Sequence, residues 1–277
     1  MRPGAQWPLV TDPSPDGIGD GGCPPYWDNA LMSSTIALIA EIHGNLAALD
    51  AVLDALRAEP PDQIVCLGDV AATGPQPREV WRRMQGLGCP VVMGNADAQL
   101  LHVPLPATEA DEDARRITDI DRWCAAQLDD ADRAFLASFQ PIVEISLGEE
   151  RRPLCCHGSP RSYDDVIVAT TSDNELDGMI AGSDATIIAG GHTHVRMLRA
   201  YRGREIVNLG SVGLAYQFFP DGGVHVPPWA EFALLSQADT VAVSVDFRRV
   251  PYDRDATVRA MIEREMPHAA WWAADWR

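Results

Sequence analysis

The sequence has little positive charge for its length. Across 277 residues, 22 Lys and Arg face 40 Asp and Glu, which gives a formal net charge of −18 and an isoelectric point of about 4.6. Such a surface repels nucleic-acid backbones and anionic membranes, so neither a nucleic-acid polymer nor a membrane is expected as a partner. A small anionic ligand would need local positive charge at its site, and bound metal ions are one source of it.

Long apolar runs and paired cysteines are missing as well. No apolar stretch reaches the ~20 residues that span a bilayer, and the N-terminus lacks the basic region followed by an apolar one that marks a signal peptide. The six cysteines include no CxxC pair. Several of them lie in apolar runs, where a free cysteine behaves as a small hydrophobic residue. These absences predict a cytoplasmic protein with reduced thiols.

The first 31 residues differ from the rest in composition. Residues 1–31 hold clusters of Pro and Gly without hydrophobic periodicity, and are predicted to be a flexible leader, with Met32 as an alternative start. Residues 32–277 are short enough to form a single domain. Within that domain we expect a helical insertion at 104–140 and a helical tail rich in tryptophan at 251–277.

The tail allows two interpretations. Three of its residues, Trp271, Trp272 and Trp276, would mark a partner surface if they were exposed, and a homo-oligomer would then form through them. More often such a tail folds back on its own domain.

From residue 36 onward, strand-like and helix-like patterns alternate along the chain. This alternation predicts parallel strands joined by right-handed crossovers, and therefore an α/β fold. Strands are expected at 36–40, 64–67, 90–93, 142–147, 153–156, 185–189, 197–201, 205–207, 232–235 and 241–250, and helices at 46–58, 78–87, 117–128, 130–139 and 172–181.

Polar side chains that can bind metals follow five of these strands. In an open α/β sheet, ligands bind at the carboxyl ends of the strands. Carboxylate, imidazole and amide donors suit Mn, Fe, Zn or Ni better than Mg or Ca. One catalytic ion takes about three protein groups, so seven donors predict two ions about 3.5–4 Å apart that share a carboxylate. The donors are Glu41, His43, Asp69, Asn95, His157, His192 and His194.

Each donor alone has a simpler explanation. A histidine at a strand end is more often a structural residue than a ligand. Ser159 and Ser211 would suggest a serine nucleophile, but neither lies in a GxSxG sequence. The segment 210–213 is instead expected to form a turn beneath the site, and His225 is a weak candidate for its rim. The ordered set of five motifs favours the metal site.

The same motifs resemble those of a known family. The series Glu41-x-His43, Gly68-Asp69, Gly94-Asn95, His157-Gly158 and Gly191-His192-x-His194 is similar to that of the calcineurin-like metallophosphoesterase superfamily, and most closely to its small bacterial branch of compact phosphodiesterases. The resemblance covers roughly residues 36–250. It implies a four-layer α/β/β/α sandwich, with the helical insertion beside the site.

The resemblance also implies roles for the seven donors. Glu41, His43 and His194 would hold the first metal ion, Asp69 would bridge, and Asn95, His157 and His192 would hold the second. A hydroxide that bridges the two ions would then hydrolyse a phosphodiester. Both ions would be divalent transition metals, with manganese first and iron, zinc or nickel as alternatives. Asn45 and Arg161 lie beside ligands and are predicted to contact the phosphate.

Two positions depart from the family pattern. Glu41 stands where the family normally has Asp, and the extra methylene moves the carboxylate by about one C–C bond. Ala96 stands where the family often has a His that assists the leaving group, and alanine cannot transfer a proton. The loss should slow hydrolysis least for diesters and for esters whose leaving group is a stable anion.

The sequence therefore predicts hydrolysis of a small phosphate ester, with phosphodiesters ahead of monoesters. A nucleotide or dinucleotide polyphosphate hydrolase and a phosphoprotein phosphatase remain alternatives. A protein of another class, which binds metal or nucleotide with little turnover, is a further alternative because of Glu41 and Ala96.

Overall fold

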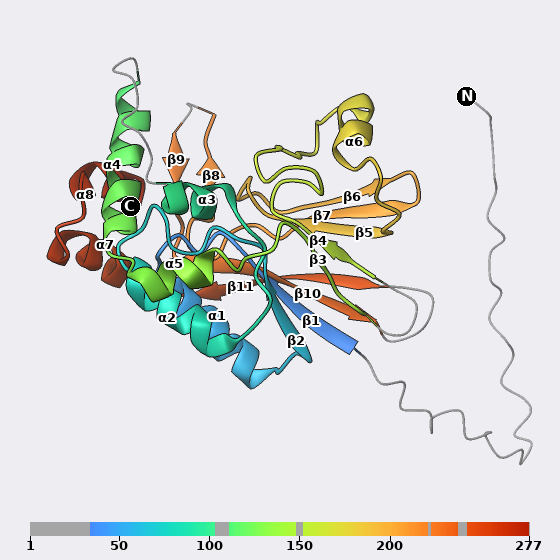
Figure 1. Cartoon of the computed structure of the whole chain (residues 1–277), viewed down its shortest axis with the longest axis horizontal. Coiled ribbons are helices and arrows are strands. Elements are labelled where there is room, and N and C mark those ends of the chain that lie inside the picture. The colour runs from blue at the N-terminus through green and yellow to red at the C-terminus, as the bar shows by residue number, and fades with distance from the viewer. Residues whose placement is uncertain (1–33, 103–110, 148–151, 221–222, 238–242, 277) are drawn as a thin grey trace, which may run out of the picture. The chain divides into compact units, whose positions relative to one another are not determined.

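The computed structural model describes residues 34–102, 111–147, 152–220, 223–237 and 243–276 (Figure 1). The predicted leader at residues 1–31 lies outside this part of the chain. The helices are α1 (Leu46–Ala58), α2 (Pro77–Leu87), α3 (Asn95–His102), α4 (Glu112–Ala126), α5 (Asp130–Leu136), α6 (Asp173–Met179), α7 (Arg254–Glu263) and α8 (Ala269–Trp272), which a 3-10 turn at Ala273–Asp275 follows. The strands are β1 (Ser34–Ile39), β2 (Gln63–Cys66), β3 (Val143–Glu144), β4 (Leu154–Cys155), β5 (Ile187–Gly190), β6 (Met197–Tyr201), β7 (Arg204–Asn208), β8 (Gln217–Phe218), β9 (Val224–His225), β10 (Trp229–Gln237) and β11 (Ser244–Pro251).

The strands form two main sheets. The first has the order β11-β10-β1-β2, in which β1 is parallel to β2 and antiparallel to β10. The second has the order β3-β4-β5-β7-β6, with β4, β5 and β7 parallel. The strand expected at 90–93 is reduced to isolated bridges. The Val92 N–H donates to Cys66 and the Met93 N–H to Gln140, so its bonds are divided between two neighbours and no continuous ladder forms.

Three apolar cores separate the helices and sheets. Alternate side chains of β1 point to opposite faces, so Ala37 and Ile39 pack against α1 and α2 while Leu38 lies between the two sheets. The neighbouring cysteines divide in the same way: Cys155 faces the first sheet, and Cys156 faces α6. Figure 1 shows α1 and α2 along the first sheet and α6 on the far side of the second. The predicted α/β class is confirmed, and α6 is the only helix over the second sheet among the described residues.

The helical insertion lies against the loop that follows β2. Helix α4 begins earlier than expected, because the Asp111 carboxylate caps it by accepting from the N–H groups of Asp113 and Ala114. On the inner face, the Thr73 hydroxyl donates to Asp121 over 2.8 Å. Since Thr73 lies four residues beyond Asp69, the insertion supports the neighbourhood of a candidate ligand.

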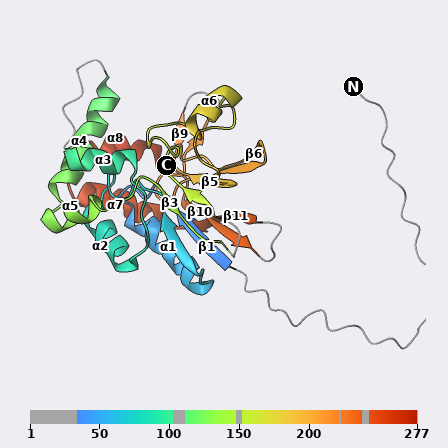
Figure 2. The same ribbon diagram turned by 45° about the vertical axis from the view of Figure 1, so that its right-hand side comes forward.

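The tryptophan-rich tail folds back on its own domain. Trp272 and Trp276 are only 9% and 4% exposed. The Arg116 guanidinium lies 5.1 Å over the Trp271 ring, and Figures 1 and 2 both show α8 beside α4. The tail therefore completes the helical side of the domain, and a homo-oligomer through these rings stays a prediction.

None of the helices in the described ranges has the length and apolarity of a membrane-spanning segment. The five cysteines in these ranges are free.

Candidate metal centre

Tight turns deliver the candidate ligands. Five of them have backbone angles in the left-handed region, which non-glycine residues rarely adopt. Strained conformations of this kind persist where the surrounding structure imposes them, and they concentrate at functional sites. The φ angles are +57° at Glu41, +46° at His43, +54° at Asp69, +66° at His192 and +59° at His194.

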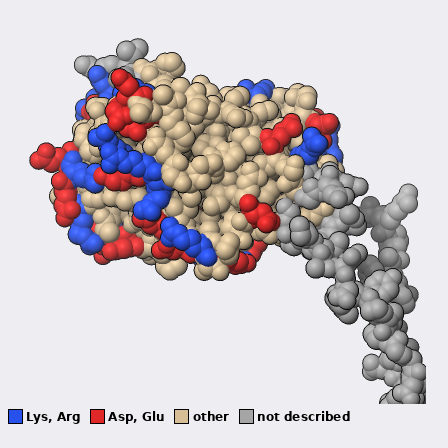
Figure 3. All heavy atoms as spheres, turned by 60° about the horizontal axis from the view of Figure 1, so that its bottom comes forward, with Lys and Arg blue, Asp and Glu red and all other residues tan. Residues whose placement is uncertain are grey.

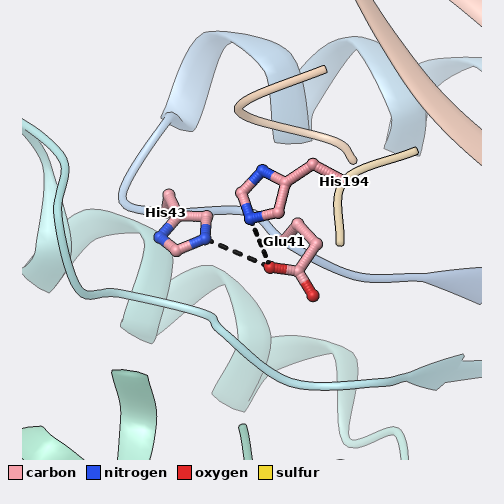
Figure 4. A group of neighbouring side chains, drawn as sticks. All are labelled: Glu41, His43 and His194. Carbon is pink, nitrogen blue, oxygen red and sulfur yellow. Dashed lines mark hydrogen bonds and ion pairs between the residues drawn. The ribbon is translucent and has the colours of Figure 1, made fainter. Parts of the chain in front are cut away.

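The first group of ligands surrounds one oxygen of Glu41. Its Oε2 lies 3.2 Å from His43 Nε2 and 3.0 Å from His194 Nε2 (Figure 4), and all three side chains are buried. The opposite ring nitrogens bond to the backbone: His43 Nδ1 lies 3.1 Å from the Ala72 carbonyl and His194 Nδ1 lies 2.8 Å from the Leu214 carbonyl. Both Nε2 atoms therefore point to the same carboxylate.

The second group surrounds His157. Its Nε2 lies 3.4 Å from Asp69 Oδ2 and 3.0 Å from Asn95 Oδ1. Its Nδ1 lies 2.7 Å from the Leu67 carbonyl, so this ring is oriented in the same way as the other two. A carboxylate, an amide oxygen and an imidazole thus converge from the turn after β2, the start of α3 and the end of β4.

Two carboxylates connect the groups. Asp69 Oδ2 also lies 3.7 Å from His43 Nε2, in agreement with the bridging position that the resemblance implies. Glu41 reaches across as well, since its Oε1 lies 3.5 Å from His157 Nδ1, and the sequence did not indicate this. The His192 N–H donates to the same Oε1 over 2.5 Å, and the His192 ring centroid lies 5.2 Å from that of His157. All seven predicted ligands therefore lie at one place.

The charges of the cluster stabilise one another. Burial alone would raise the pKa of Glu41 and Asp69, but the nearby imidazoles, His157 above all, hold both pKa values below their usual range. Burial would likewise lower the pKa of the imidazoles. The two carboxylates outweigh it and raise the pKa of His43 to about 9 and that of His157 to about 10.

The donor set fits a divalent transition metal. A carbonyl at Nδ1 requires a proton on that nitrogen, which leaves the lone pair of a neutral imidazole on Nε2. Nε2 and carboxylate oxygens then face each other at 3.0–3.7 Å, a spacing in which either a proton on Nε2 or a metal ion can lie between the two atoms. Two donors that are each about 2.1 Å from one ion lie roughly 3.0–3.6 Å apart. The two buried triads are Glu41 with His43 and His194, and Glu41 with Asp69 and His157.

Asp97 is a supporting residue that sequence reasoning missed. Its fully buried carboxylate accepts from the Asp69 N–H over 2.7 Å and from the Val70 N–H over 2.9 Å. Burial and the charge of Asp69 raise the pKa of Asp97 to about 7. Asp97 therefore fixes the turn that carries Asp69. In the sequence it resembles an ordinary acidic residue in the first turn of a helix.

The predicted turn at 210–213 does lie beneath the site. The Gly213 N–H and the Ser211 hydroxyl both donate to the Glu41 carbonyl, over 2.7 Å and 2.9 Å. A Cβ at Gly213 would collide with the Ile42 backbone, so only glycine allows this approach. Ser211 is fully buried and Ser159 donates to Asp165, which gives both hydroxyls structural partners rather than the environment of a nucleophile.

The two predicted phosphate-contacting residues have other roles in this structure. Asn45 is fully buried and caps α1, because its Oδ1 accepts from the Ala48 N–H and from the Thr257 hydroxyl. Arg161 is 53% exposed and forms a two-point ion pair with Asp165. The predicted contacts of Asn45 and Arg161 with phosphate therefore gain no support from the geometry.

A separate hollow of about 550 Å³ lies between α1 and α2, and none of the candidate ligands lines it. Two of its arginines, Arg57 and Arg83, pair with Asp54 and Asp50. Figure 3 shows arginine and acidic side chains interleaved at the helix-bearing end of the molecule. Because the charges in and around this hollow are largely balanced, we assign the chemistry to the buried cluster.

Comparisons with known proteins identify the family of the chain. Residues 35–223 match the model of the calcineurin-like phosphoesterase superfamily domain. An uncharacterized protein of Methanocaldococcus jannaschii is 23% identical over 252 residues, which cover 86% of this chain and 96% of that protein. A symmetrical bis(5'-nucleosyl)-tetraphosphatase of Erwinia tasmaniensis is 30% identical over 151 residues, about half of each chain.

Solved structures show the same fold. A metallophosphoesterase from Sphaerobacter thermophilus is 26% identical and superposes with a TM-score of 0.66 over 87% of this chain and 99% of that one. A hypothetical protein from Pyrococcus horikoshii OT3 has a TM-score of 0.71 at 20% identity, over 88% and 98% of the two chains. Members of the matched family use divalent metal ions, and the two ligand groups here could hold such ions. The chain belongs to the calcineurin-like phosphoesterase superfamily.

Proposed function

We propose that this protein is a metal-dependent hydrolase of phosphate esters that prefers phosphodiesters to monoesters. The observation that carries this proposal is the pair of buried carboxylates, Glu41 and Asp69, each of which contacts imidazoles of both ligand groups. Such an arrangement suits two ions held close together rather than one.

The residues divide between two ions as the family pattern implies. Glu41, His43 and His194 would hold one ion, and Asn95, His157 and His192 the other, with Asp69 between them; manganese is the first metal to test. When bound, such ions lower the pKa of a water molecule and neutralise the phosphoryl oxygens. The protein supplies fixed imidazole orientations, because backbone carbonyls hold the Nδ1 atoms of His43, His157 and His194.

The preference for diesters follows from Ala96. Its N–H donates to Asp69 Oδ1 over 2.9 Å, so residue 96 lies beside the site, but its methyl group has no proton to give to a leaving group. Esters whose leaving group is already a stable anion do not need that proton. Alkyl monoesters, including phosphoserine in proteins, need it most and are therefore the poorer substrates.

A dinucleoside polyphosphate hydrolase is the second candidate. The Erwinia tasmaniensis relative is described as a symmetrical bis(5'-nucleosyl)-tetraphosphatase. Cleavage of a phosphoanhydride releases a nucleotide, which is a stable anion, and so it also tolerates Ala96.

The test compares an aryl phosphodiester with the matching aryl monoester and a dinucleoside tetraphosphate. Initial rates are measured with manganese for the wild type, Glu41→Asp and Asp69→Asn, and metal content is determined by mass spectrometry. We expect the diester to exceed the monoester and Asp69→Asn to lose activity. Asp132→Asn is the matched control, since Asp132 is a buried carboxylate that caps α5 away from the ligands.

Three outcomes are informative. Faster turnover of the tetraphosphate than of the diester would favour the second candidate. Monoester hydrolysis faster than diester hydrolysis would contradict the proposed preference for phosphodiesters. Metal binding without turnover of any ester, by the wild type and by Glu41→Asp alike, would mean that the protein binds metal but is not a phosphoesterase.

A further inference from the structure

A row of aromatic rings leads from the candidate metal centre to the protein surface. The His43 and His194 rings stack with centroids 5.0 Å apart, and His194 stacks on Tyr216 at 4.8 Å with an interplanar angle of only 7°. Tyr216 in turn contacts Phe218 edge-to-face at 6.1 Å. Phe218 is 65% exposed, the largest value among the apolar side chains that the structure describes as large and exposed.

The outer end of this row lies on the β8–β9 hairpin. The pairing of Phe218 with Val224 and of Gln217 with His225 fixes which side chains share a face. Tyr216, Phe218 and Val224 lie on the face that continues from His194. On the other face, Phe219 contacts His225 at 6.4 Å, so His225 does not belong to the ring row. Figure 1 shows the hairpin projecting on the side of the molecule that carries α3, the helix that begins with Asn95.

Packing does not account for Phe218. Tyr216 is partly buried against the helical core, so its ring has a structural role there. Phe218 belongs to none of the three apolar cores, and it leaves most of its surface in water on a hairpin whose strands are two residues long each. Exposed aromatic side chains that adjoin a polar site are typical of ligand-binding surfaces.

The geometry also indicates what would bind. Tyr216 meets the Phe218 ring edge-to-face at 62°, and Phe218 is 65% exposed, so a planar group can stack on the outer face of the Phe218 ring. A neutral planar group is not repelled by the acidic protein surface. In a ligand that joins such a group to a phosphate, the phosphate would lie at the metal centre, which is separated from Phe218 by the rings of Tyr216 and His194. A nucleobase joined to a phosphate through a ribose has this division into a neutral plane and a charged end.

We propose that the face formed by Tyr216 and Phe218 binds the nucleobase of a nucleoside phosphate ester; this inference rests on the proposed function of the metal centre. It identifies the substrate class as nucleotidyl esters or anhydrides. The hairpin supplies base stacking, which tolerates any base because each has an aromatic face.

The test uses two ligands that differ only in the base. Adenosine 5'-monophosphate and ribose 5-phosphate are titrated calorimetrically into the manganese-loaded protein, without any need for turnover. We expect adenosine 5'-monophosphate to bind about 10-fold more tightly, as base stacking on an aromatic ring typically provides. Phe218→Ala should abolish this difference and leave ribose 5-phosphate unchanged, while Phe218→Trp should restore it.

The matched control is Phe219→Ala, which removes an exposed ring from the opposite face and should preserve the difference. Equal affinities in the wild type, or a difference that survives in Phe218→Ala, would overturn the proposal. A change from oligomer to monomer in Phe218→Ala, measured by light scattering, would instead identify the surface as a contact between copies and would also overturn it. Failure of ester hydrolysis, with the base-dependent binding intact, would count against the proposed function alone.

Discussion

The two halves of the candidate metal centre are held in place by different means. In the first half, Glu41, His43 and His194 all have left-handed backbone angles, so tight turns aim each side chain. In the second half, Asp69 and His192 do so, while Asn95 starts α3 and His157 follows β4. The first half depends on strained turns at all of its ligands, and the second half combines strained turns with regular elements.

The supporting bonds differ in the same way. The turn that carries Asp69 is fixed by a buried carboxylate, Asp97, which accepts from two consecutive backbone N–H groups. The turn that carries Glu41 is fixed mainly by bonds to its carbonyl from Ser211 and Gly213. A substitution of Asp97 alone can thus remove the support of the turn in the second half. In the first half, substitution of the ligand Glu41 itself is expected to have the larger effect on metal binding.

Removing Glu41 should have the largest effect, because this residue contacts both halves. In Glu41→Ala, His43, His157 and His194 lose a buried carboxylate, and we expect ester hydrolysis to fall by about 10³-fold or more, with metal lost from both positions. The measurements are the initial rate on an aryl phosphodiester and the metal content per chain. Retention of two ions per chain would show that Glu41 does not join the halves, and Asp132→Asn serves as the control for general destabilisation.

Sequence reasoning located this centre because the signal was local. Each ligand follows a short apolar run, and the carboxyl ends of parallel strands meet at one edge, so Asp69 and His157 could be brought together without knowing any distance. The same argument explains α1, whose apolar spacing and Asn45 cap match the observed Leu46–Ala58.

The rest depended on contacts that no local pattern encodes. Helix α3 was not predicted because its eight residues show no apolar periodicity. The strand expected at 90–93 does not form a continuous ladder, because its backbone hydrogen bonds are divided between two partners. The reach of Glu41 to His157 depends on side-chain length and on the spacing between the two sheets. The β8–β9 hairpin has strands of two residues each, too short to give an alternating pattern.

The pH dependence of metal binding should distinguish the two halves. Because the metal-free pKa is about 9 for His43 and about 10 for His157, both imidazoles carry protons at pH 7 that a metal must displace. Affinity should therefore rise by up to about tenfold per pH unit for each displaced proton, and level off first for the ion at His43.

Isothermal titration with manganese from pH 6 to about pH 10.5, in buffers of different ionisation enthalpy, measures both the affinity and the protons released. In Glu41→Gln the rise should move to lower pH, because the carboxylate that raises the pKa of His43 is gone. An affinity that is flat with pH, with no proton release, would show that the imidazoles are neutral in the metal-free protein.

Asp97→Asn tests the support of the second half. The amide can accept one backbone bond through its oxygen, but its NH₂ group then faces an N–H donor of Asp69 or Val70. We expect metal affinity at the second half to fall by about 10–100-fold, as changes behind a ligand typically do, with little change at the first half. Competition with a fluorescent chelator should show two separated affinities in the variant. A uniform loss at both positions would show that Asp97 supports the whole fold instead.

The smallest effect concerns the support of the first half by the helical insertion. Asp121 accepts from the Thr73 hydroxyl, next to Ala72, whose carbonyl orients His43, and burial raises the pKa of Asp121 to about 6. From about pH 4 to 6 this carboxyl ionises in the unfolded chain but not in the folded one. The free energy of unfolding therefore falls as the pH rises through this range, and it stays at the lower value above pH 6. Asp121→Asn keeps an acceptor for Thr73 without the charge, and should raise the free energy of unfolding by about 1–2 kcal/mol at pH 7 and by nothing at pH 4. Urea denaturation at both pH values measures this difference. Destabilisation at pH 7 would show that the charge itself helps to hold the first half in place.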